Sequence, residues 1–125
     1  ERVELIECDL VEGVPLELTQ SFSVLVSNPP YIPTSVLEQE VPAEVKGFEP
    51  ELALDGGEDG LDVYRRLLEV APRMLLPGGM LCIELYEGHL DKAARLAEEQ
   101  GVWESVEVKE DLTHRPRILV AHLAK

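Results

Sequence analysis

The chain has 125 residues and a mass of 13.9 kDa, which is the size of one ordinary domain. It is 45% hydrophobic and 29% charged, a globular composition that excludes a disordered or fibrous chain. Eleven Lys and Arg face 25 Asp and Glu, so the formal net charge is -14. Because nucleic acids are bound mainly through cationic side chains, this excess of acids argues against a nucleic-acid-binding protein.

No apolar run of the sequence is long enough to cross a bilayer, and the first residues do not form a signal peptide. Cys8 and Cys82 each lie in an apolar run and form no Cys-x-x-Cys pair. This pattern predicts buried free thiols in a reducing compartment. We therefore expect a cytoplasmic domain with no membrane contact and no metal site.

Two strands are predicted in the first quarter of the chain, at residues 3–8 (VELIEC) and 22–27 (FSVLVS). The second is apolar enough to be buried on both faces, as in a parallel sheet. It ends at Asn28-Pro29-Pro30, because proline cannot donate a ladder hydrogen bond. Ser35 and Glu38 then form a capping box that predicts a short helix, followed by a long loop over residues 43–60.

The rest of the chain alternates between helix and strand. Helical spacing of apolar residues predicts a helix from residue 61 to 70, with a bend at Pro72 because this residue lacks the N–H that a helix interior needs. The remaining elements are, in order, a turn at 77–79, a strand at 80–85, a helix at 89–100 capped by Gly101, and strands at 105–111 and 118–123. The last two strands predict an antiparallel hairpin, and the whole pattern predicts an α/β fold.

The segment Asn28-Pro29-Pro30-Tyr31 is the strongest candidate for a functional site. It follows the carboxyl end of a buried strand, where open α/β sheets bind ligands. Two prolines stiffen the turn, so the Asn28 amide oxygen and the Pro29 carbonyl can be held as acceptors for a planar NH2 group. The Tyr31 ring offers a flat surface for the same group. The alternative is a strand-ending turn in which Asn28 bonds its own backbone.

These residues also carry a family resemblance. The segments 27–33 (SNPPYIP), 48–50 (FEP), 52–62 (LALDGGEDGLD) and 77–79 (PGG) resemble the HemK-type protein-glutamine N5-methyltransferases, which modify the glutamine of the Gly-Gly-Gln loop in peptide-chain release factors. The tetrapeptide is shared with amino-group DNA methyltransferases, whereas the second and third segments are more specific to the glutamine enzymes. The resemblance runs over essentially the whole chain.

The resemblance implies a role for each residue of the tetrapeptide. Asn28 and the Pro29 carbonyl would accept the two hydrogens of the substrate amide, within a catalytic turn that includes Pro30. Tyr31 would pack against the amide. Because accepting both N–H bonds returns electron density to the nitrogen and aims it at the methyl sulfonium, no ionisable general base is required.

The resemblance also implies residues that bind S-adenosylmethionine. Asp9 would hydrogen-bond the adenine amino group, Leu10 would make the apolar contact beside it, and Asn28 would contribute as well. The family usually has glycine where this chain has Cys8. Glu84 matches an acidic position of the family and is equally consistent with a carboxylate at the rim of the sheet.

The main departure from the family lies upstream of these residues. The family's cofactor-binding half holds a glycine-rich turn, whereas this chain contains no Gly-x-Gly. We therefore expect residues 1–125 to form a partial methyltransferase domain, the C-terminal portion of a Rossmann-like class I sheet without the N-terminal cofactor-binding half. Such a chain should bind the cofactor weakly and be inactive alone.

The expected complete sheet has the strand order 3-2-1-4-5-7-6, of which this chain would keep strand 3 and strands 4 to 7, ending in the antiparallel hairpin. Without strands 1 and 2, residues 22–27 become an exposed sheet edge, and such edges attract partners. We expect residues 3–8 to pair with that edge or with another copy of the chain.

Three functions remain open from the sequence. The first is methylation of a release factor through its Gly-Gly-Gln loop. The second is an amino-group DNA methyltransferase, which the tetrapeptide permits and the net charge of -14 opposes. The third is a non-catalytic remnant or interaction module, which the missing cofactor half favours.

Overall fold

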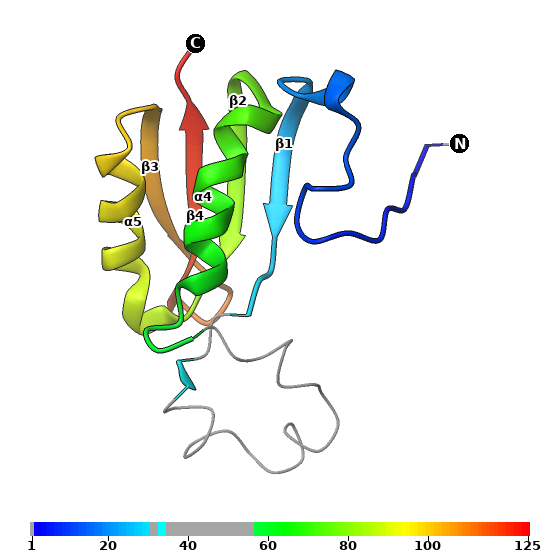
Figure 1. Ribbon diagram of the computed structural model, residues 1–125. Coiled ribbons are helices and arrows are strands. Elements are labelled where there is room, and N and C mark those ends of the chain that lie inside the picture. Colours follow the sequence, from blue (N-terminus) through cyan, green and yellow to red (C-terminus); the bar gives the residue numbers. More distant parts are fainter. Residues whose placement is uncertain (1, 31–32, 35–56) are drawn as a thin grey trace.

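The computed structural model describes residues 2–30, 33–34 and 57–125 (Figure 1). They form a four-stranded sheet in the order β1-β2-β4-β3 with two long helices. The elements are η1 (Leu16–Leu18), β1 (Phe22–Ser27), α4 (Asp62–Met74), β2 (Leu75–Glu84), η2 (Glu87–His89), α5 (Leu90–Glu99), β3 (Trp103–Glu110) and β4 (Pro116–Leu123). The helix predicted from Ser35 and Glu38 lies outside the described residues, as does most of the loop predicted at 43–60.

The sheet confirms the predicted topology of its described strands. β1 and β2 are parallel, and β4 is antiparallel to both β2 and β3. The order β1-β2-β4-β3 therefore corresponds to the 4-5-7-6 portion of the expected sheet. The hairpin of β3 and β4 is also confirmed, and Gly101 ends the preceding helix with a left-handed φ of 70°.

The strand predicted at residues 3–8 is wrong. This segment has no regular structure and is exposed (Figure 1); Leu5, for example, keeps 92% of its accessible surface. A strand is stable only beside a hydrogen-bonded neighbour. In the expected order that neighbour is strand 2, and the described residues contain no such strand. The free edge of β1 does not replace it, and Cys8 is exposed rather than buried.

Both long helices lie on the same face of the sheet (Figure 1). Because side chains alternate along a strand, one residue in two of β2 and β4 meets the helices. Leu81 and Ile83 of β2 are fully buried there, as are Leu119 and Ala121 of β4. The helices complete this core with Tyr64, Leu67, Leu68 and Ala71 of α4 and with Leu90, Ala93 and Ala97 of α5. Neither helix is long and apolar enough to span a membrane, nor is any other helix in the described part of the chain.

The opposite face of the sheet carries apolar side chains that no described element covers. Val24 pairs with Met80 and Val26 with Cys82, which places these residues on that face. Val24 is 44% exposed and Val26 is 73% exposed. β1 therefore presents both a free hydrogen-bonding edge and an open apolar face, whereas the sequence pattern predicted burial on both faces.

Helix α4 runs through Pro72 as far as Met74, so it does not end at residue 70 as predicted. Pro72 cannot donate to the carbonyl of Leu68, four residues earlier. The Gln100 side chain replaces the missing donor, with Nε2 donating to the Leu68 carbonyl at 2.8 Å. Gln100 is held in turn by the Trp103 indole N–H, which donates to its Oε1 at 2.7 Å. The proline is tolerated because a residue beyond the end of α5 satisfies the freed carbonyl.

Replacing Gln100 with Ala should lower the free energy of unfolding by about 1–3 kcal/mol, because the Leu68 carbonyl loses its donor. The same replacement should cost less in a Pro72→Ala background, where the residue 72 N–H can donate to that carbonyl. Loss of the Trp103 partner is common to both backgrounds and cancels in this double-mutant cycle. Urea unfolding of the four proteins measures the difference, and equal costs in the two backgrounds would contradict the assignment.

The turn predicted at residues 77–79 lies inside β2 as a bulge. The register advances from Phe22↔Leu75 to Val24↔Met80, so β2 holds extra residues there. Gly79 is required at this place, since a Cβ would lie 2.9 Å from the Leu76 carbonyl oxygen and 3.2 Å from that of Phe22. The close approach of β1 therefore accounts for a glycine within the strand.

Candidate functional site

The turn at the carboxyl end of β1 is the centre of the candidate site. Ser27 is the last strand residue and pairs with Ile83 of β2. Asn28 follows it and is exposed, Pro29 is buried and Pro30 is half-buried. The prolines therefore seat the turn against the domain and leave the Asn28 side chain accessible. Tyr31 lies outside the described residues.

A cavity of about 550 Å³ opens beside Asn28 at this end of the sheet. Because β4 is antiparallel to β2, its first residues lie beside the last residues of β2. The cavity lining is apolar at Val26, Cys82 and Ile118, and polar at Asn28, Glu84, Asp111 and Arg117. Four strand ends therefore supply one small site, with an amide, two carboxylic acids and one guanidinium.

These charges favour some ligands over others. Glu84 and Asp111 outnumber Arg117 in the lining, so an anionic phosphate would meet net negative charge. A neutral carboxamide or a positively charged sulfonium would not be repelled. In the described part of the chain, no group of three or more His, Cys, Asp or Glu could hold a metal ion. The net negative charge of the lining therefore disfavours an anionic ligand.

Asp111 organises the hairpin turn that carries Arg117 into the cavity. Its Oδ1 accepts hydrogen bonds from the Thr113 hydroxyl at 2.6 Å and from the Thr113 backbone N–H at 2.8 Å. The same oxygen accepts from the Arg115 N–H at 3.2 Å. These bonds, led by that from the hydroxyl, lower the pKa of Asp111. The other oxygen, Oδ2, lies 3.4 Å from Arg117 Nε, so the guanidinium faces an ionised carboxylate.

Asp9 and Leu10, the residues implied for the cofactor, lie elsewhere. They line a separate cavity of about 370 Å³ between residues 9–19 and helix α4. Asp9 accepts a hydrogen bond from Arg66 Nη2 of α4 at 2.7 Å, and Leu10 adopts a left-handed φ of 53°. The structure therefore does not bring Asp9 or Leu10 together with Asn28 in one cavity.

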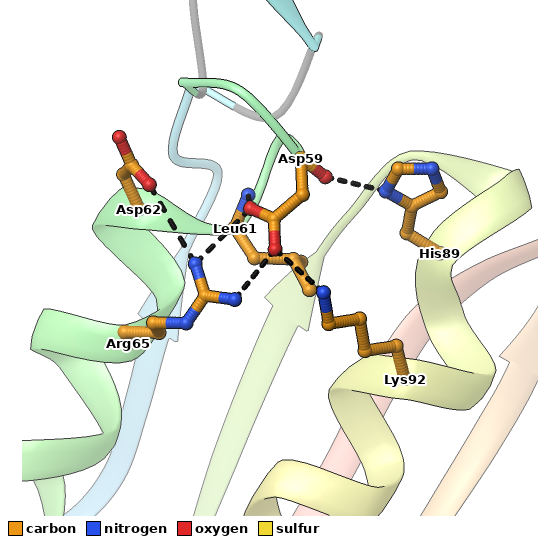
Figure 2. A network of polar contacts seen from close by, with 6 residues as sticks. All are labelled: Asp59, Leu61, Asp62, Arg65, His89 and Lys92. Carbon is orange, nitrogen blue, oxygen red and sulfur yellow. Dashed lines mark hydrogen bonds and ion pairs between the residues drawn. The ribbon is translucent and has the colours of Figure 1, made fainter.

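The far end of the turn is tied to a second loop. Pro33 is buried, and the Thr34 N–H donates to the Gly57 carbonyl at 2.8 Å. Gly57 begins a tight turn in which the Gly60 N–H donates back to the same carbonyl at 3.2 Å. Asp59, in this turn, is the centre of a network with both helices (Figure 2). The candidate turn thus follows β1, and Thr34, later in the chain, is joined to residues 57–60.

The sequence did not single out Asp111, Arg117 or Asp59 as site residues. Arg117 could have been found from the predicted hairpin, because antiparallel pairing brings the start of the last strand beside the end of the strand at 80–85. Asp59 could not, since its partner Lys92 lies 33 residues away.

The chain is similar to named methyltransferases of several bacteria, although no family model matches it. The release factor glutamine methyltransferase of Clostridium acetobutylicum is 37% identical over 124 residues, which are 97% of this chain and 41% of that protein. That of Thermosynechococcus vestitus is 50% identical over 97 residues, 78% of this chain and 33% of that protein. The chain thus spans between a third and about two fifths of the length of these relatives.

Two solved structures share the fold. The Mtq2-Trm112 complex of E. cuniculi, responsible for methylation of the eRF1 translation termination factor, matches with a TM-score of 0.58 and 22% identity, over 95% of this chain and 60% of that one. A methyltransferase from Pyrococcus furiosus matches with a TM-score of 0.53 and 20% identity, over 82% of this chain and 41% of that one. The described sheet is therefore part of a Rossmann-like methyltransferase fold. On its sequence, the chain is similar, over most of its own length, to the release factor glutamine methyltransferases.

Proposed function

We propose that this chain supplies the substrate side of an S-adenosylmethionine-dependent enzyme that methylates N5 of a glutamine in the Gly-Gly-Gln loop of a peptide-chain release factor. The observation that carries the proposal is the exposed Asn28 on a buried Pro29, at the carboxyl end of β1 and beside a cavity. The names of the bacterial relatives support the substrate. The charge of the cavity lining supports an uncharged amide.

The proposed mechanism rests on two acceptors. An amide nitrogen is a poor nucleophile because its lone pair is delocalised into the carbonyl. The Asn28 side-chain oxygen and the Pro29 carbonyl accept its two N–H bonds, which fixes the nitrogen in one orientation and returns electron density to it. S-adenosylmethionine, when bound, supplies an electrophilic methyl group. The bound cofactor would supply the methyl carbon for the new N–C bond and keep the electron pair of the C–S bond that breaks, and one of the two amide protons would then pass to water.

We infer that this chain by itself offers few of the contacts that would hold the cofactor. Asn28 faces the cavity in which the methyl group would lie, whereas Asp9 and Leu10 line a different one. The described chain therefore does not assemble an adenine site of its own, and we infer that it binds the cofactor weakly and is inactive alone. We also propose that the chain associates with a second copy through the free edge of β1, because that edge pairs with no described strand.

Methyl transfer from labelled S-adenosylmethionine tests the proposed substrate. The full-length product of the gene should label a release factor and should leave double-stranded DNA unlabelled. A release factor whose Gly-Gly-Gln glutamine is replaced by glutamate is the control, and it should stay unlabelled. Labelling of DNA instead would favour an amino-group DNA methyltransferase, and no labelling of either substrate would favour a non-catalytic remnant.

A further inference from the structure

The carboxylate of Asp59 is the centre of the largest polar network in the described residues (Figure 2). Arg65, in the first turn of α4, donates from Nη1 to Oδ1 at 3.0 Å and from Nη2 to Oδ2. Lys92 of α5 donates to Oδ2 at 2.9 Å. The Leu61 N–H donates to Oδ1 at 3.0 Å. One short side chain therefore joins the loop at 57–61 to the first turns of both helices.

The environment keeps this carboxylate ionised. The bidentate bond from Arg65 lowers the pKa of Asp59 well below its usual range. Burial opposes this effect, and Lys92 and the Leu61 N–H lower the pKa further by smaller amounts. The Asp59 side chain is only 23% exposed, so water competes poorly for its oxygens. The His89 ring adds a contact from its Nδ1 to the backbone carbonyl of Asp59.

The network reaches the candidate site through the backbone. Asp59 lies in the turn that begins at Gly57, and the Gly57 carbonyl accepts the Thr34 N–H at 2.8 Å. Thr34 follows the buried Pro33, four residues after Pro29. Fixing Asp59 therefore fixes the Gly57 carbonyl, and with it the Thr34 N–H that donates to it.

We propose that Asp59 is a positioning residue for methyl transfer: it holds the far end of the Asn28-Pro29 turn so that the two acceptor oxygens keep their orientation. This inference rests on the proposed function. It predicts that the charge of Asp59, rather than the bulk of its side chain, is required, because Arg65 and Lys92 bind it as a carboxylate.

Glu58 offers a matched control. It precedes Asp59 in the same turn and is exposed. Glu58→Gln removes one negative charge beside Asp59 and should leave the network intact. Asp59→Asn keeps the size of the side chain and removes the charge that three donors share.

The test compares both variants in the full-length product of the gene. Asp59→Asn should raise the hydrogen-exchange rate of the Thr34 amide by about tenfold, because the charged bonds that fix its acceptor are lost, without raising the rates of the β4 amides. It should also lower kcat for methyl transfer by about tenfold and leave KM for S-adenosylmethionine unchanged. Glu58→Gln should change none of these quantities.

Two results would overturn the positioning role. One is a Thr34 exchange rate in Asp59→Asn equal to that in Glu58→Gln. The other is faster exchange at Thr34 and β4 alike, which would mean a general loss of stability. If the unaltered protein transferred no methyl group at all, the proposed function would fail, while the exchange rates would still decide whether Asp59 fixes the turn.

Discussion

Replacing Asn28 with Ala is expected to lower kcat for methyl transfer by roughly 10²–10³-fold, the usual effect of removing one preorganised hydrogen-bonding group from a reaction centre. The amide nitrogen would lose one of its two acceptors and the orientation that this acceptor imposes. Because Asn28 is exposed and follows the end of β1, the free energy of unfolding should change by less than about 0.5 kcal/mol.

Ser23→Ala is the control for this variant, since Ser23 is exposed on the same strand and should alter neither quantity. Steady-state kinetics with a release factor, together with urea unfolding, measure both effects. A kcat for Asn28→Ala within about threefold of the unaltered enzyme would show that Asn28 does not hold the reacting amide.

Replacing Tyr64 with Ala should lower the free energy of unfolding by about 3–5 kcal/mol, the typical cost of removing a buried aromatic side chain. Tyr64 is fully buried and is the largest side chain of the core. Its hydroxyl donates to the Ala93 carbonyl at 2.7 Å, which joins α4 to α5. A loss of that size is a large part of the stability of an ordinary domain.

Two companion variants separate the causes of this loss. Tyr64→Phe removes only the hydroxyl and should cost about 0.5–1.5 kcal/mol. Leu112→Ala alters a fully exposed side chain in the hairpin turn and should cost almost nothing. Urea unfolding compares the three, and a cost for Tyr64→Ala below about 1 kcal/mol would show that the helices do not pack as described.

The elements whose structure is decided by residues close together in the sequence were predictable. The run of apolar residues at 22–27 predicted β1, the helical spacing at 89–100 predicted α5, and the alternation after Gly101 predicted the hairpin. Each element could be predicted from its own segment, because the period of its apolar side chains and the glycine that ends a helix lie within or next to it.

The errors arose where a distant segment decides the outcome. Residues 3–8 have the composition of a strand, but no described strand lies beside them. Pro72 carries the signal of a helix break, but Gln100 donates to the Leu68 carbonyl that Pro72 leaves free, and Gln100 lies 32 residues from Leu68 in the sequence. Neither the missing neighbour strand nor the distant hydrogen-bond donor can be predicted from local propensity.

The candidate site shows the same division. The Asn28 turn follows a strong strand and was predicted from its own residues, and the structure places it at the expected edge of the sheet. Asp111 and Arg117 join the same cavity only because β3 and β4 return beside β2. The cofactor residues implied at Asp9 and Leu10 do not join it, since their segment packs against α4 instead.

The central claim is that the Asn28-Pro29 turn holds a glutamine side chain for methylation at nitrogen. Peptide mass spectrometry of a release factor, after incubation with the full-length product of the gene and S-adenosylmethionine, tests it most directly. The account predicts a single methyl group on the side-chain nitrogen of the Gly-Gly-Gln glutamine, and none when the enzyme carries Asn28→Ala. A methyl group on any other residue, or equal modification by the Asn28→Ala enzyme, would contradict it.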